Sequence, residues 1–397
     1  MDPAQDNDRR ETKHRWRENL VGYTAALMAA SSTVRRNDAR AAIAAAVRAF
    51  AEADPRGRIE REEIGPRATL WVDDRTDDPQ AFARSVARGL SSQPRQLDCR
   101  YLYDEIGSEL FSRITEQPEY YPTRAETEIL ADHADRLASE LGAVPICELG
   151  SGTSEKTRLL LDAWSREASE GFHYLPVDID PAVLRTAVPA LAARHGQLHV
   201  SGLATSYENA LERLRELTPK LVLFLGSTIG NFEPSEMDEF LRQLEAALQP
   251  GDAFLLGIDL VKDAAVLEAA YNDAAGVTER FTVNLFDRMN RELGAGIPEK
   301  AVEHVAFWNE RCDRIEIYGR FRQDVRIDLP ALERRFEVES GEMVRVEVSR
   351  KFRVEQMGEL LSRYRLRLDR VLTDAGRRFA LLLLRRTRRA GEAGLAA

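Results

Sequence analysis

The stretch 145–157 constrains the fold more than any other part of this sequence. It opens with a short apolar run ending at Glu148, passes through a turn that holds Gly150 and Gly152, and leads into a helical pattern over residues 156–164. Glycine lets the backbone turn sharply and lets a ligand approach the main chain where a Cβ would intrude. Such a turn between a strand and a helix is typical of nucleotide-like ligand sites in open α/β sheets. The stretch therefore predicts a strand, a turn and a helix at a ligand site.

The spacing of the glycines narrows the choice of ligand. The turn reads E-x-G-x-G rather than G-x-G-x-x-G, and it lacks the G-K-[ST] ending of a triphosphate loop. A second apolar run, residues 172–180, ends in Asp178 and Asp180, and an acid at this strand tip can accept hydrogen bonds from a ribose. These features favour S-adenosylmethionine (SAM), which carries adenosine without phosphate, over a dinucleotide. In the alternative interpretation, the two acids only cap the helix that starts at Pro181.

Composition limits the partners that the chain can have. A net charge of −10 argues against a nucleic-acid partner, because binding phosphates needs a concentrated basic face. The basic run at residues 385–389 is interpreted as a solvated chain end. No run of about 18 apolar residues occurs and the opening residues 1–8 are polar, so we expect neither a membrane span nor a signal peptide. We expect a cytoplasmic protein that acts on a small molecule.

Cysteine and histidine spacing predicts neither a disulfide framework nor a metal site. Cys99, Cys147 and Cys312 lie far apart, without a C-x-x-C pair, and the six histidines are scattered. Cys147, in the strand before the glycine turn, is expected to be a small buried apolar residue.

Alternating strand and helix patterns over residues 145–260 predict a parallel sheet. The apolar run 221–226 has the character of a central strand buried on both faces. The loop after such a strand faces the ligand crevice, which makes Thr228 and Asn231 candidate site residues. Further strands are expected from alternation and from a terminal hairpin, at residues 68–72, 306–308, 314–321, 325–329, 343–352, 366–372 and 379–384. Helices are expected at residues 16–28, 38–53, 78–90 and 356–363, and residues 55–66 are expected to form a connector.

An aromatic-rich segment precedes the glycine turn. Within residues 101–121 the chain holds four tyrosines and a phenylalanine, including Tyr103, Phe111 and Tyr120. We interpret this segment as the lid of a ring-lined pocket. The alternative is that the rings only brace a domain interface.

Several sequence blocks together resemble a known family, the histidine Nα-methyltransferases of ergothioneine biosynthesis. The matching blocks are residues 103–104, 107–108, 110–111, 114–115, 118–124, 148–157, 224–231, 259–263, 347–349 and 351–352. The resemblance covers residues 68–386 and implies SAM-dependent trimethylation of the L-histidine α-amine to hercynine, without a metal. It implies an α/β fold with a Rossmann-like methyltransferase domain and an α+β substrate-binding domain. The residues ahead of the match have no counterpart in the family, and their own pattern predicts a helical, partly disordered N-terminal extension. The implied boundaries are 1–67 for the extension, 125–260 plus 352–386 for the methyltransferase domain, 68–124 plus 261–351 for the substrate domain, and 387–397 for a tail.

The resemblance also implies which residues form the site. SAM would be held by Gly150, Gly152, Lys156 and Asp178, with its adenine beside Ser206 and Tyr207. The substrate carboxylate would meet Asn231 and Tyr271, and the amine would lie near the catalytic residues Gly226, Thr228 and Tyr120. The imidazole would lie among Tyr103, Phe111, Ile317, Glu347 and Ser349.

The chemistry of methyl transfer agrees with these residue types. Displacement at a sulfonium mainly requires that the two reactants be oriented, which can supply about 7–11 kcal/mol of the barrier. The hydroxyls of Tyr120 and Thr228 can orient a neutral amine while water removes its proton. Glu347 and Ser349 would partner the imidazole nitrogens, so a ring without them would leave a buried carboxylate unpaired. In the alternative interpretation, Glu347 is an ordinary strand acid that pairs with Arg345 or Arg350.

Two positions depart from the pattern of the family. Residues 205–207 read Thr-Ser-Tyr where relatives commonly carry Gly-Asp-Phe, so an acid beside the adenine is absent. Ile317 stands where methionine is common, which changes the packing around the ring and leaves room for another substrate. Two other functions therefore stay open: N-methylation of another aromatic amino acid, such as tryptophan or a modified histidine, and a non-catalytic partner subunit that binds SAM or an amino acid.

Overall fold

The computed structural model describes residues 59–73, 80–142, 144–168, 171–215 and 217–387. They belong to one compact unit, Phe50–Ala397, and a second unit covers Met1–Ala49. The helices predicted at residues 16–28 and 38–53 lie outside the described residues, as does nearly all of the predicted tail.

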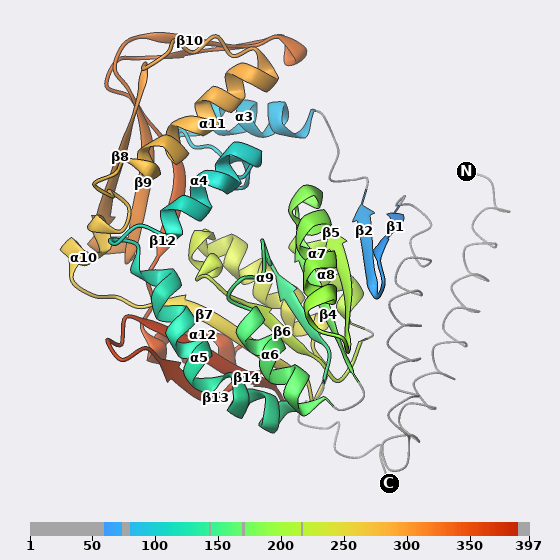
Figure 1. The fold of residues 1–397 in the computed structure, drawn as a ribbon. Helices are drawn as coiled ribbons and strands as arrows, with labels where there is room; N and C mark the ends of the chain where they lie inside the picture. Colours follow the sequence, from blue (N-terminus) through green and yellow to red (C-terminus); the bar gives the residue numbers. More distant parts are fainter. Residues whose placement is uncertain (1–58, 74–79, 143, 169–170, 216, 388–397) are drawn as a thin grey trace, which may run out of the picture. The chain divides into compact units, whose positions relative to one another are not determined.

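The largest sheet in the described part of the chain has nine strands (Figure 1). Its strand order is β1-β2-β5-β4-β3-β6-β7-β14-β13. The strands are β1 (Ile59–Gly65), β2 (Ala68–Asp73), β3 (Ile146–Leu149), β4 (Phe172–Asp178), β5 (Leu198–Ala204), β6 (Leu221–Phe224), β7 (Ala253–Asp259), β13 (Leu366–Thr373) and β14 (Phe379–Arg386). Neighbours from β2 to β7 pair in parallel, whereas β1 at one edge and the β13–β14 hairpin at the other pair antiparallel. The predicted parallel sheet with a terminal hairpin is confirmed.

Helices α6 (Arg158–Glu167), α7 (Pro181–Arg194), α8 (Tyr207–Leu214) and α9 (Pro234–Ala247) follow parallel strands of this sheet, α5 (Tyr121–Leu141) precedes β3, and α12 (Val354–Ser362) precedes the β13–β14 hairpin. Pro181 and Pro234 open α7 and α9, where the missing N–H of proline costs nothing. Glu233 and Glu236 form a capping box at the start of α9. The loops that follow β3, β4, β5 and β6 all lie at one edge of the sheet, because parallel strands end on the same side.

A second group of elements surrounds a smaller, antiparallel sheet, shown with helices α3, α4 and α11 in Figure 1. Its strands are β8 (Val302–Asn309), β9 (Arg314–Phe321) and β12 (Met343–Arg350), with a separate hairpin of β10 (Val325–Leu329) and β11 (Arg334–Val338). Its helices are α3 (Ala81–Ser91), α4 (Glu105–Thr115), α10 (Ala264–Ala269) and α11 (Val277–Leu293).

Buried apolar side chains gather into two hydrophobic clusters. One contains residues of the nine-stranded sheet and its helices, such as Trp164 and Phe172. The other contains residues of α3, α4, α11 and the smaller sheet, such as Phe281 and Ile317. The chain passes between the clusters four times: after β2, after Tyr121, after β7 and after β12. Both clusters therefore combine segments that are distant in the sequence.

The structure differs from the sequence predictions at three strands. Residues 59–65, predicted as part of a connector within the N-terminal extension 1–67, form β1 and pair with β2. Strand β2 pairs with β5 in the large sheet, whereas the predicted boundaries assign residues 68–73 to the substrate domain. Strand β11 was not predicted at all. The reason is the same at β1 and β11: both are rich in charged residues and pair along one edge only, so neither shows a strong apolar alternation.

Candidate functional site

The glycine turn after β3 is held by the tip of β4. The backbone N–H groups of Gly150 and Ser151 donate to the Val177 carbonyl at 2.8 and 3.0 Å. Gly150 has a φ of 71°, and a Cβ added there would lie 2.7 Å from the Tyr207 hydroxyl oxygen. Gly150 is itself exposed. The turn therefore needs glycine for both conformation and space, and it leaves backbone open to a ligand.

Asp178 and Asp180 have different partners. Asp180 is the N-cap of α7, where its carboxylate accepts from the Ala182 N–H at 2.8 Å. Asp178 instead accepts from the Gly152 N–H at 2.8 Å. Burial raises the pKa of Asp178, and the bonds from the backbone oppose this rise. The helix-capping interpretation is thus correct for Asp180, whereas Asp178 is tied to the glycine turn.

Glu148 lies beneath the turn and is only 3% exposed. Its carboxylate accepts a hydrogen bond from the Thr157 hydroxyl at 2.7 Å and another from the Tyr174 hydroxyl. Burial raises the pKa of Glu148 to about 7, although both bonds oppose the rise. Glu148 therefore braces the turn from below and needs no ligand to satisfy it.

Tyr207, which follows β5 in the sequence, lies against the glycine turn. Ser206 is the N-cap of α8, which places Tyr207 at the first helical position. The Tyr207 ring packs edge-on against Phe224, with the ring centroids 5.3 Å apart. Burial, followed by the nearby Asp178 carboxylate, raises the pKa of the Tyr207 hydroxyl. Among the described residues this hydroxyl has no hydrogen-bond partner, so it remains available at the predicted cofactor position.

Glu126, on α5, connects the glycine turn with the loop after β6 and was not predicted. Its fully buried carboxylate pairs with Lys156 and accepts from the Gly226 N–H at 2.8 and 3.1 Å. A Cβ at Gly257 would lie 2.4 Å from a Glu126 oxygen, so that glycine makes room for the acid. One signal was present in the sequence, since Glu126 shares a helix face with the apolar Ile129 and Leu130.

The loop after β6 presents acceptors. Because Glu126 occupies its N–H, exposed Gly226 can offer a ligand only its carbonyl oxygen. The Thr228 hydroxyl donates to the Leu225 carbonyl at 2.9 Å, which leaves lone pairs on its oxygen. Half-buried Asn231 ends the short 3-10 helix η3 (Thr228–Asn231), in the loop that the sequence predicted to be functional.

Five aromatic residues pack together near this loop, and we call them the aromatic cluster. Its members are Tyr103, Phe111, Tyr120, Tyr271 and Phe281, with neighbouring ring centroids between 5.4 and 6.3 Å apart. Sequence reasoning found four of them and missed Phe281, which sits in an ordinary amphipathic pattern of α11. Burial raises the pKa of Tyr120 and of Tyr103 well above the ordinary value, so both hydroxyls stay protonated.

Glu347 faces the aromatic cluster from β12. It pairs directly across the sheet with Ile317, so the two side chains share one face. Ile317 belongs to the same hydrophobic cluster as Tyr120, Tyr271 and Phe281. The negative charge of an ionised Glu347 adds to the rise that burial causes in the pKa of Tyr103, Tyr120 and Tyr271. Burial raises the pKa of Glu347 itself to about 7, with the Lys351 charge opposing. No described residue forms a hydrogen bond or ion pair with its carboxylate.

The alternative pairing of Glu347 does not occur. Arg345 lies 2.6 Å from a Glu233 oxygen, in an ion pair, and Arg350 donates to the Cys312 carbonyl at 2.8 Å. A bulge between Arg345 and Glu347 turns the arginine to the other face of the sheet, opposite Tyr318. Glu347 is therefore an acid directed at the aromatic cluster without a protein partner.

Tyr271, a member of the aromatic cluster, contacts Ser349 on β12. Their hydroxyl oxygens are 2.7 Å apart, and both lie 2.8 Å from the Lys351 nitrogen. The sequence predicted the two hydroxyls as site residues but assigned no role to Lys351. The structure thus brings four predicted residues together in the aromatic cluster, with Ser349 bonded to Tyr271. It links Asp178 to the glycine turn at Gly152, and Glu126 joins Lys156 to Gly226. No hydrogen bond or ring contact among the described residues brings Asn231 to the aromatic cluster.

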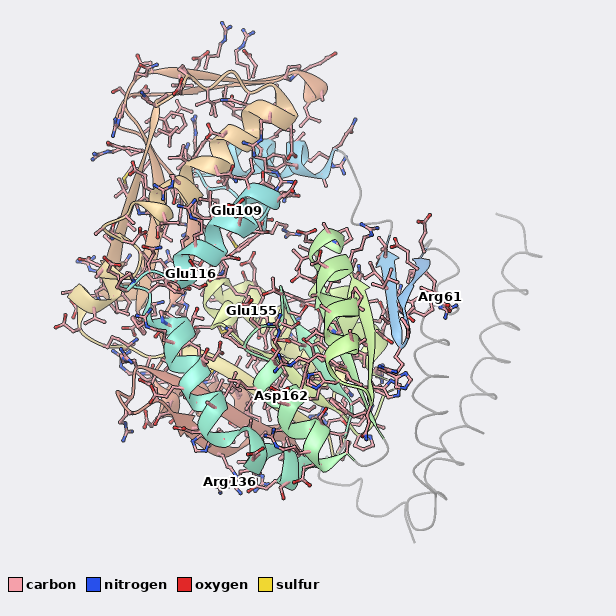
Figure 2. All side chains as sticks on the ribbon, viewed as in Figure 1. Arg61, Glu109, Glu116, Arg136, Glu155 and Asp162 are labelled. Carbon is pink, nitrogen blue, oxygen red and sulfur yellow. The ribbon has the colours of Figure 1, made fainter. Side chains whose placement is uncertain are left out.

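Two features of the described residues bear on other kinds of function. No helix in these ranges is both long and apolar enough to cross a membrane. No group of three or more potential metal-binding side chains occurs in the part of the chain that the structure describes. Figure 2 labels several of the acids that instead lie at the surface, including Glu109 on α4 and Glu155 beside the glycine turn, both exposed.

Comparisons with known proteins converge on one family. Residues 82–386 match a family model described as "Histidine-specific methyltransferase, SAM-dependent". Over 304 residues the chain is 43% identical to a histidine N-alpha-methyltransferase of Mycolicibacterium smegmatis, covering 77% of this chain and 94% of that protein. The corresponding protein of Mycobacterium tuberculosis is 41% identical over 303 residues, covering 76% and 94%. Ergothioneine biosynthesis protein 1 of Neurospora crassa is 38% identical over 208 residues, covering 51% of this chain and 23% of that protein. The family match includes every predicted site residue.

Proposed function

The chain belongs to the family of histidine-specific, SAM-dependent methyltransferases, and from this premise we propose that it methylates the α-amine of L-histidine, three times in succession, to form hercynine. The relatives named for ergothioneine biosynthesis support a role in that pathway. The observation that carries the proposal is Glu347, a carboxylate among aromatic rings that no described residue satisfies.

An imidazole ring suits the surroundings of Glu347. The rings of the aromatic cluster can pack against an aromatic substrate, and the carboxylate can pair with a ring N–H. A substrate without a nitrogen at that position would leave the acid buried and unpaired, which discriminates strongly against it. Ile317 lies directly beside Glu347 and would contact the same ring. These contacts favour histidine over tyrosine or phenylalanine.

The amine end of the substrate would meet acceptors. SAM, when bound, supplies a methyl group on a positively charged sulfur. The glycine turn suits its nucleoside, because Gly150 leaves backbone exposed and both Asp178 and Tyr207 have polar atoms beside it. The Gly226 carbonyl and the Thr228 oxygen can accept N–H bonds from the amine, which would direct its lone pair. Tyr120 stays protonated and so orients the amine without acting as the base.

A mass-spectrometric assay tests the proposal. Purified protein is incubated with SAM and a panel of L-histidine, L-tryptophan, L-tyrosine and histamine, beside the variants Glu347→Ala and Glu303→Ala. Glu303 is the matched control, since it lies on β8 of the same small sheet and forms exposed ion pairs with Arg320 and Arg322. We expect gains of one, two and three methyl groups on histidine for the wild type and the control, and at least a hundredfold lower kcat/KM for Glu347→Ala.

Other outcomes would redirect the proposal. Methylation of tryptophan instead of histidine would favour the alternative amino acid substrate, for which Ile317 leaves room. Binding of SAM without turnover of any amino acid would contradict an enzymatic role and favour a partner subunit.

A further inference from the structure

A buried ionic network lies behind the predicted substrate residues. The Lys351 side chain, just after β12, is 1% exposed, and its nitrogen lies 2.9 Å from an oxygen of the equally buried Asp259. Asp259 ends β7 and also accepts from Lys262 at 2.6 Å and from Tyr121 at 2.7 Å. Burial raises the pKa of Asp259, but the two lysines outweigh it and the pKa lies below its ordinary value. The carboxylate is therefore ionised and balances a buried cation.

The Lys351 ammonium has no donor left for a ligand. A lysine ammonium carries three N–H groups and no acceptor. Three oxygens surround this nitrogen: Asp259 at 2.9 Å, and the Tyr271 and Ser349 hydroxyls at 2.8 Å each. Any influence of Lys351 on a substrate must therefore pass through the two hydroxyls.

Counting protons shows what the two hydroxyls can do. Both oxygens accept from Lys351, so neither can send its own proton back to the lysine. The oxygens are 2.7 Å apart, and one of the two hydroxyl protons forms the bond between them. The other proton has no acceptor among the described residues. The Tyr271–Ser349 pair thus presents one hydroxyl proton, next to a buried positive charge.

We propose that Lys351 is a positioning residue that directs this proton toward the carboxylate of the amino acid substrate. This inference rests on the proposed histidine substrate. A hydroxyl that already accepts from an ammonium is a stronger donor, and the nearby cation attracts an anionic group. The network therefore selects an α-amino acid over the corresponding amine that lacks a carboxylate. Lys351 acts on selectivity without touching the substrate.

Lys262 provides a matched control for the charge itself. It pairs with the same Asp259 carboxylate but is 12% exposed and donates to Tyr121 instead of Tyr271 or Ser349. Replacing Lys262 removes one cation from the aspartate and leaves the two hydroxyls with their lysine. If Lys351 only balanced Asp259, the two lysine variants would behave alike.

Calorimetric binding of L-histidine and of histamine, both to protein saturated with S-adenosylhomocysteine, tests the inference. The variants are Lys351→Met, Lys262→Met, Tyr271→Phe and the double variant Lys351→Met/Tyr271→Phe. We expect Lys351→Met to weaken histidine binding by about 10- to 100-fold and histamine binding by less than about threefold. Lys262→Met should leave both within about threefold. The double variant should be no weaker for histidine than Tyr271→Phe alone, because both changes remove one oriented proton.

The outcomes separate this inference from the proposed function. Equal losses for histidine and histamine in Lys351→Met, or equal losses in the two lysine variants, would overturn the inference while histidine remains the substrate. If wild-type protein neither binds nor methylates histidine, the proposed function itself fails. Affinity for S-adenosylhomocysteine verifies that each variant is folded. If Lys351→Met does not fold, Tyr271→Phe decides alone, since a loss shared by both ligands contradicts the oriented proton.

Discussion

Glu148 and Glu347 are two acids in different halves of the candidate site, the first buried and the second half-buried, and they differ in what satisfies them. Burial raises the pKa of each to about 7. Glu148, beneath the glycine turn, accepts hydrogen bonds from Thr157 and Tyr174. Glu347, facing the aromatic cluster, accepts from no described residue. The raised pKa alone therefore does not separate a structural acid from one that awaits a ligand, whereas the count of hydrogen-bond donors does.

The same contrast extends to the surroundings of the two acids. In the cofactor half, Asp178, Glu148 and Glu126 are all bonded to the protein before any ligand arrives. In the proposed substrate half, the Glu347 carboxylate and the Tyr103 and Tyr120 hydroxyls have no hydrogen-bond partner among the described residues. Of the tyrosine hydroxyls in the aromatic cluster, that of Tyr271 is bonded to Ser349 and Lys351. The cofactor half is thus shaped in advance, and the substrate half depends on its ligand for satisfaction.

The largest expected effect comes from adding a methyl group at Gly150, in the glycine turn of the proposed cofactor half. We expect Gly150→Ala to weaken S-adenosylhomocysteine binding by about 100-fold or more, because left-handed strain costs about 1–3 kcal/mol and the Cβ would press on the Tyr207 hydroxyl. Adding Tyr207→Phe should recover part of the loss. Gly152→Ala is the matched control, with a φ of 50° and no described atom within 4 Å of its Cβ. Calorimetry measures the three variants beside the wild type. Equal losses of affinity for Gly150→Ala and Gly152→Ala, with no recovery on adding Tyr207→Phe, would show that Tyr207 does not restrict the space at Gly150.

A second expected effect concerns stability and sharpens the contrast between the acids. Glu347 has a folded pKa of about 7 against an ordinary 4.5, so its contribution to stability is lost as the pH rises through that range. We expect Glu347→Met to stabilise the ligand-free protein by up to about 3 kcal/mol at pH 8, and by almost nothing at pH 5. At pH 5, Glu148→Met should instead destabilise by about 1–3 kcal/mol, because the Thr157 and Tyr174 hydroxyls lose their acceptor.

Urea unfolding at pH 5, 6, 7 and 8 measures both variants. If Glu347→Met were less stable than the wild type at pH 8, Glu347 would have a partner in the ligand-free protein. That result would contradict the proposed difference between the two acids.

The smallest expected effect concerns Glu126, which contacts both Lys156 beside the glycine turn and Gly226 in the loop after β6. Glu126→Gln keeps an acceptor for the Gly226 N–H but loses the ion pair with Lys156, whose side chain is 27% exposed. We expect about tenfold weaker binding of both S-adenosylhomocysteine and histidine. Glu128→Gln, two residues along the same helix, is the control, because its one bond from the Ala375 N–H needs only an oxygen. A loss confined to one ligand would show that Glu126 serves only one half.

Much of the fold was readable from the sequence because the relevant signals are local. The buried run at β6 and the alternation of β9 identified both strands. The sequence did not predict β1 and β11 as strands, because their charged residues show no such pattern. Both strands form by pairing with a neighbouring strand. The domain boundaries were read from family resemblance, and residues 68–73 show how a strand can pair with one that comes much later in the sequence, here β5.

The sequence by itself determined the glycine turn and the parallel sheet around it. A backbone with positive φ favours glycine, and a strand buried on both faces needs a continuous apolar run, so both features are visible in a few consecutive residues. Only the tertiary structure decided which acids are satisfied. Glu126 meets Gly226 across 100 positions and Lys351 meets Tyr271 across 80. No local pattern specifies such pairs, since the partners of a buried charge come from whichever distant segments pack against it.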